Sequence, residues 1–144
     1  RNRLSEDMGG VTIDNGRGGM GGRLIAFSDG FEMGFTVPRK GKTVFHLGPI
    51  AVTGRSADGK TKWAMPPTEL NVDDLVLTPD IAYWVGHYEA GRKPAELRVI
   101  SLQDGKVRAT HELAAFPAYN GMSAAGNKLF ISTREGKLLC FEGR

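Results

Sequence analysis

Short runs of alternating apolar and polar residues, each bounded by Gly, Pro, Asn or Asp, make up most of the chain. Such alternation is typical of an extended strand, because successive side chains of a strand point to opposite faces. No segment longer than two turns has the 3.6-residue apolar spacing of a helix. The clearest runs are 75–77, 81–85, 97–102 and 129–132. The pattern predicts an all-β chain of antiparallel strands.

Steps of an acidic residue followed by Gly separate these runs. They stand at 29–30, 58–59, 104–105 and 135–136. Gly adopts the positive φ that a tight hairpin turn needs, so each step predicts a turn between two strands. Twenty glycines in 144 residues, about twice the usual share, agree with a chain rich in turns.

The chain also repeats itself. Residues 58–63 match 104–109 as a turn that opens into a strand, although Trp63 has no counterpart in the second copy. Gly59 and Gly105 lie 46 residues apart, close to the period of about 40 to 50 residues of a propeller blade. We therefore predict antiparallel four-stranded blades of a partial β-propeller. The expected divisions are a Gly-rich lead-in at 1–22, a degenerate blade at 23–72, a complete blade at 73–114 and, at 115–144, a final blade lacking its last strand.

One family shares this C-terminal series of motifs. Asp-Gly-Lys at 104–106, Asn-Gly-Met at 120–122 and a strand ending in Cys140-Phe141 resemble the last blades of pyrroloquinoline-quinone-like (quinoprotein-like) β-propellers. The resemblance is closest to the large extracytoplasmic versions of planctomycete-type bacteria. It implies a periplasmic or secreted propeller of PQQ-like repeats in which Trp63 packs between neighbouring blades. The calcium-binding set and the disulfide of adjacent cysteines found in true quinone-dependent dehydrogenases cannot be placed here, so the sequence supports no cofactor.

Composition and charge exclude several classes of function. Nineteen basic and sixteen acidic residues give a net charge of +3, which is too small and too dispersed to favour a nucleic-acid partner. No apolar run approaches the roughly 18 residues of a membrane span, and residues 1–7 lack the apolar core of a signal peptide. The chain begins with Arg, so we expect a processed product or a piece of a longer protein. The single cysteine, Cys140, excludes an internal disulfide and is expected to be buried.

Residues that could carry catalysis do not combine into a site. The segment 16–21 has the letters of a dinucleotide-binding loop but precedes a strand, so we interpret it as a flexible loop. The three histidines, His46, His87 and His111, are isolated along the sequence. Asp73 and Asp74 are neighbours on a strand and point to opposite faces. We predict no catalytic, cofactor-binding or metal-binding residue.

The segment from residue 84 to residue 96 holds the candidate contact residues. Its loop, 89–96, is longer than the two to five residues usual for hairpins, and binding residues are often placed on such loops. We predict contact with a ligand or partner at Trp84, His87, Tyr88, Arg92 and Lys93, with the two cations facing an anionic group.

Three hypotheses for the function follow. The first is a non-catalytic propeller segment that acts as a scaffold or binding platform for a protein or small ligand, completed by the rest of the propeller or by a second copy of the chain. The second is the C-terminal part of a quinone-dependent oxidoreductase whose catalytic residues lie outside this chain, with PQQ as its cofactor. The third is a self-contained β-sheet adaptor that another chain completes.

Overall fold

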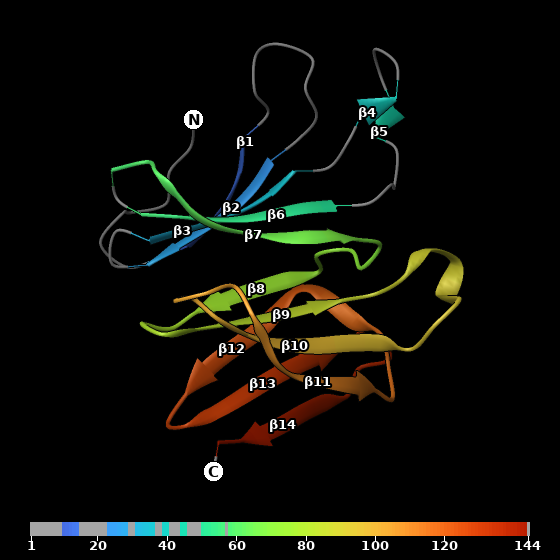
Figure 1. The fold of residues 1–144 in the computed structure, drawn as a ribbon. Helices are drawn as coiled ribbons and strands as arrows, with labels where there is room; N and C mark the ends of the chain where they lie inside the picture. Colours follow the sequence, from blue (N-terminus) through green and yellow to red (C-terminus); the bar gives the residue numbers. More distant parts are fainter. Residues whose placement is uncertain are drawn as a thin grey trace.

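The chain forms antiparallel β-sheets stacked face to face (Figure 1). The computed structural model describes residues 10–14, 23–28, 31–36, 39–40, 44–45, 50–56 and 58–143, with side chains for 31, 33, 52–56 and 58–143. Within these residues the prediction of an all-β chain is confirmed. The segment 16–21 and His46 lie outside the described residues.

The N-terminal sheet has five strands in the order β1-β2-β3-β6-β7. Its strands are β1 (Gly10–Asp14), β2 (Arg23–Ser28), β3 (Phe31–Thr36), β6 (Ile50–Arg55) and β7 (Thr61–Thr68). A separate pair of short strands, β4 (Arg39–Lys40) and β5 (Val44–Phe45), lies between β3 and β6 in the sequence. Strand β1 falls within the stretch 1–22, for which the sequence analysis predicted only a Gly-rich lead-in, and it pairs with β2 along its full length.

The central sheet is a four-stranded meander in the order β11-β10-β9-β8. Its strands are β8 (Asp74–Leu77), β9 (Ile81–Gly86), β10 (Ala95–Ser101) and β11 (Val107–Leu113). A single 3-10 turn, η1 (Glu89–Gly91), interrupts the connection from β9 to β10. All four strands come from one contiguous stretch of sequence, and strands that are consecutive within it pair with each other.

The C-terminal sheet has three strands in the order β12-β13-β14, and β14 is an edge strand within the described part of the chain. Its strands are β12 (Pro117–Ala125), β13 (Lys128–Thr133) and β14 (Leu138–Glu142). Strand β12 lies beside β8 of the central sheet. Figure 1 shows the resulting order of the stack, with the central sheet between the other two.

Two apolar cores fill the spaces between the sheets. The first joins the N-terminal and central sheets and includes Met33, Val52, Trp63, Leu75, Ala82, Trp84 and Ile100. The second joins the central and C-terminal sheets and includes Val85, Ala95, Leu97, Leu113, Met122, Leu129 and Ile131. The central sheet is therefore covered on both faces, whereas burial on β14 alternates along the strand.

Trp63 on β7 connects the first two sheets. Its indole Nε1 donates a hydrogen bond to the carbonyl oxygen of Leu102, at 2.8 Å. The ring lies over Gly54 of its own sheet and against Gly105 of the central sheet, and a Cβ on either glycine would come within 2.5 Å of a ring atom. The resemblance implied that Trp63 packs between neighbouring blades, and the structure shows it packed between two neighbouring sheets.

Candidate functional site

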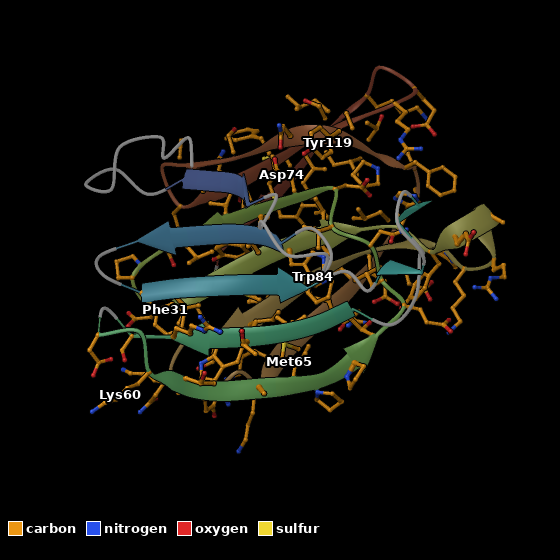
Figure 2. The ribbon with its side chains drawn as sticks, turned by 90° about the horizontal axis from the view of Figure 1, so that it is seen from above. Phe31, Lys60, Met65, Asp74, Trp84 and Tyr119 are labelled. Carbon is orange, nitrogen blue, oxygen red and sulfur yellow. The ribbon has the colours of Figure 1, made fainter. Side chains whose placement is uncertain are left out.

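Trp84 belongs to the core and not to a surface. It lies on β9 with its side chain fully buried, beneath the N-terminal sheet in the view of Figure 2. Its Nε1 donates to the carbonyl oxygen of Asn71 at 3.0 Å, and the guanidinium of Arg98 lies 5.2 Å from the ring centroid. The prediction that Trp84 offers an exposed aromatic contact is wrong, because β9 is an inner strand of a sheet covered on both faces.

Tyr88, at the end of β9, is also buried and is fixed by charged neighbours. Its hydroxyl donates to Glu96 Oε1 at 2.8 Å and accepts a hydrogen bond from Arg98 Nη2 at 3.2 Å. Arg98 Nε in turn donates to Glu96 Oε2 at 3.0 Å. Desolvation, together with the hydrogen bond to Glu96, raises the pKa of the Tyr88 phenol. Tyr88 therefore positions the loop that follows it, and its ring is not an open contact surface.

The predicted cations Arg92 and Lys93 do reach solvent. Both side chains are exposed on the loop after η1. Arg92 Nη2 lies 3.9 Å from Glu69 Oε2, and both of these side chains are 62% exposed, so the pair is screened by water and contributes little to stability. Lys93 Nζ lies 4.9 Å from the ring centroid of Tyr88. Positive φ at Ala90 and Gly91 turns the loop so that these cations project outward.

His87 stands at the centre of a polar cluster that joins the central and C-terminal sheets. Its Nδ1 lies 2.6 Å from Asp73 Oδ2, and Arg134 Nη2 lies 3.5 Å from Asp73 Oδ1. Phe116 meets the His87 ring edge-on, with centroids 6.3 Å apart, and the Arg134 guanidinium lies 5.9 Å from the Phe116 centroid. The half-buried His87 side chain is therefore held by a buried carboxylate.

Asp74 forms a second link between these two sheets. Its carboxylate accepts hydrogen bonds from the backbone N–H of Leu75 and of Met122, each at 2.7 Å. Desolvation raises the pKa of the Asp74 carboxyl in spite of these two bonds. Asp74 is labelled in Figure 2. Sequence reasoning missed this role, because the partner Met122 lies 48 residues along the chain and alternation alone does not show which face another sheet will cover.

An open cavity of about 690 Å³ lies beside the polar cluster. One wall is the loop after η1 with Arg92 and Lys93, and the other includes Glu112, Phe116 and Glu135. Backbone hydrogen bonding lowers the pKa of the exposed Glu135 carboxyl, which keeps it ionised. The two walls therefore present opposite charges to one volume, an arrangement suited to binding a polar segment.

Other candidates from the sequence lie apart from this cavity. Cys140 is exposed, so the prediction that it is buried is wrong: β14 alternates, and Leu139 and Phe141 take the side that faces the core. His111 on β11 is exposed, with its ring 5.8 Å from that of Phe141.

Among the described side chains, no three His, Cys, Asp or Glu residues gather as metal ligands. No helix in the described part is long and apolar enough to cross a membrane.

Comparison with known proteins bears on the fold alone. Neither a family model nor a curated protein matches the chain. The crystal structure of the computationally designed Ika4 protein is similar to this chain, with a TM-score of 0.52 over 97% of this chain and 95% of that one. The sequences are only 8% identical. This likeness supports the arrangement of strands and carries no information about activity.

Proposed function

We propose that this chain is a non-catalytic segment of a β-propeller that acts as a scaffold and presents a binding platform. The arrangement of the sheets supports this proposal. The four-stranded central sheet comes from one contiguous stretch of chain, and its neighbours pack on its two faces. Repeated sheets of this kind, placed around an axis, leave only short edges open and hold their loops rigidly.

The cavity beside His87 is the platform of this proposal. Tyr88, Glu96 and Arg98 fix the start of the loop that carries Arg92 and Lys93, so binding would cost little ordering of the backbone. We propose a protein segment as the ligand, with a carboxylate that meets the two cations. This exposed pair of cations is the single observation on which the chemistry of the partner rests.

A fluorescein-labelled hexaglutamate peptide tests the platform. Its anisotropy, measured with the full chain at low salt, should rise to saturation, and the variant Arg92→Glu/Lys93→Glu should bind far more weakly. The matched control is Lys106→Glu/Arg108→Glu, which makes the same change in net charge at the exposed turn before β11 and at the start of that strand. Equal loss of binding in both variants would show general attraction to a basic protein and would overturn the platform.

Within the described residues β14 has a partner strand on one side only, and this favours a second candidate function, an adaptor that another chain completes. The C-terminal sheet has three strands where the central sheet has four, and Leu138 at the start of β14 is 64% exposed. Unpaired edges of this kind invite pairing with another strand.

The solution mass of the chain, measured by light scattering beside a thermal melt, tests the incomplete ring. A folded assembly of two copies, or a chain that aggregates on its own, is the result expected of a partial propeller. A monomer that melts cooperatively would overturn the requirement for a partner.

A further inference from the structure

The last strands of the N-terminal and central sheets, β7 and β11, are built on the same plan. Each follows an Asp-Gly-Lys turn in which the Asp carboxylate accepts a hydrogen bond from the Lys backbone N–H at 3.1 Å. Each strand also has a β-bulge directly before the same position. The residue after the bulge is Trp63 on β7, which pairs with Gly54, and Ala109 on β11, which pairs with Val99. Ala109 therefore occupies the structural position of Trp63.

The residue whose carbonyl oxygen accepts the hydrogen bond from the tryptophan also has a counterpart in the next sheet. In the central sheet, Leu102 N donates to Asp80 O at 2.9 Å, and Leu102 O accepts the indole N–H of Trp63. In the C-terminal sheet, Gly143 N donates to Asn127 O at 3.0 Å in the same way. Gly143 therefore occupies in the C-terminal sheet the position that Leu102 occupies in the central sheet.

A cavity of about 500 Å³ lies at this second position, between the central and C-terminal sheets. Its lining includes the counterpart of Gly54, which is Val99, and the counterpart of Leu102, which is Gly143. The remaining walls combine apolar or aromatic side chains, which include Tyr83, Leu97, Leu129 and Phe141, with polar side chains, which include Thr78, His111, Lys128 and Glu142. The volume falls within the range of small-molecule sites. The interface between the N-terminal and central sheets is filled by an indole from the chain itself, whereas the interface between the central and C-terminal sheets is open at the corresponding place.

We propose that this cavity binds a planar bicyclic aromatic molecule with an N–H donor, which lies where a docking tryptophan would lie. The Gly143 carbonyl oxygen accepts one hydrogen bond from Asn127 Nδ2 at 3.0 Å, and its second lone pair remains to receive the N–H of the ligand. Tyr83 and Phe141 provide faces and edges for aromatic contact. The site is separate from the cavity beside His87, so its test is independent of the proposed platform.

Indole is the probe, and titration of the full chain followed by amide NMR is the measurement. We expect saturable shifts at Val99 and Gly143. Benzofuran has the same shape without the N–H, and it should bind about three- to tenfold more weakly, as expected for the loss of one hydrogen bond. Equal affinity for the two probes would overturn the hydrogen bond to Gly143, and the absence of saturable shifts with indole would overturn the site.

Variants that fill the cavity separate this site from unspecific binding. Val99→Gly/Ala109→Trp recreates the pair that Gly54 and Trp63 form in the first interface, and it should abolish indole binding. Thr110→Trp is the matched control, because it places the same side chain on the other face of β11, and it should bind indole as the unchanged chain does. Val99→Trp fills the cavity from β10 and replaces the double variant if that one fails to fold. Indole binding that survives in a folded, filled variant would overturn the proposal.

Discussion

The indole N–H of Trp63 and the carbonyl oxygen of Leu102 lie 2.8 Å apart, although 39 residues separate them in the chain. The bond is buried and crosses from the last strand of one sheet to the turn of the next. It therefore fixes how the two sheets sit on each other, in addition to the apolar burial around it.

Replacing Trp63 should destabilise the junction between the N-terminal and central sheets. Trp63→Phe keeps most of the apolar contact but removes the donor, which should cost about 1–3 kcal/mol of unfolding free energy, and Trp63→Ala should cost about 3–5 kcal/mol. Urea denaturation measures both. Tyr119→Phe, at a side chain that is 59% exposed, is the control and should stay within about 0.5 kcal/mol of the unchanged protein. Equal stability of Trp63→Phe and the control would contradict the role of the hydrogen bond.

Two turn glycines offer a matched comparison. Gly59 and Gly105 both have positive φ, at 80° and 69°, but a Cβ at Gly59 meets nothing within 4 Å whereas one at Gly105 lies 2.5 Å from Trp63 Cε3. Gly59→Ala should therefore cost only about 1 kcal/mol of backbone strain. Gly105→Ala should cost about 1–3 kcal/mol more, because the ring has to move. If chemical denaturation finds the two variants equal, the close packing of Trp63 on Gly105 is wrong.

The Asp74 carboxyl should make stability depend on pH. Its pKa is raised in the folded protein by desolvation, so the folded state holds the proton more tightly than the unfolded state does. The contribution of this group is therefore complete below the ordinary pKa of about 4 and declines as the pH rises through the raised value.

Urea titrations between pH 4 and pH 7 measure this effect as a difference between the unchanged protein and Asp74→Asn. The unfolding free energy of the unchanged protein, relative to the variant, should fall across this range. The amide variant should also be less stable overall. Its N–H₂ group is a donor and faces one of the two backbone N–H donors, so one of the two hydrogen bonds is lost. Asp80→Asn, at an exposed turn, is the control, and a difference that does not vary with pH would contradict the prediction.

Cys140 should react without unfolding. Its side chain is exposed on β14, so a thiol reagent such as Ellman's reagent should label one sulfur per chain in native buffer. Cys140→Ser should give no signal. Labelling that appears only in denaturant would contradict the exposure of this side chain.

The sequence predicted the strands of the central and C-terminal sheets well, because alternation and turn residues are local signals. The observed β10, Ala95–Ser101, lies within two residues of the run 97–102. The burial or exposure of individual side chains was less predictable. Trp84 and Cys140 both lie on alternating strands, yet one is fully buried and the other exposed. Which face of a strand is covered depends on the neighbouring sheet, and no local pattern contains that information.

The candidate site was predicted only in part. The loop with Arg92 and Lys93 was recognised by its length and charge, and both cations are exposed. The contact between His87 and Asp73 spans 14 residues, and that between Arg134 and Asp73 spans 61. Such pairs depend on how the sheets stack, so they could not be found from spacing along the chain.

The order of the stack also determines how a disturbance can spread through the molecule. The N-terminal and C-terminal sheets each pack a core against the central sheet, on its opposite faces. In such a linear array, stability is close to a sum of the terms for each unit and for each contact between neighbours. Damage at the Trp63 contact should therefore loosen one junction and leave the other intact, so that the protein opens by steps from either end and not as a single unit.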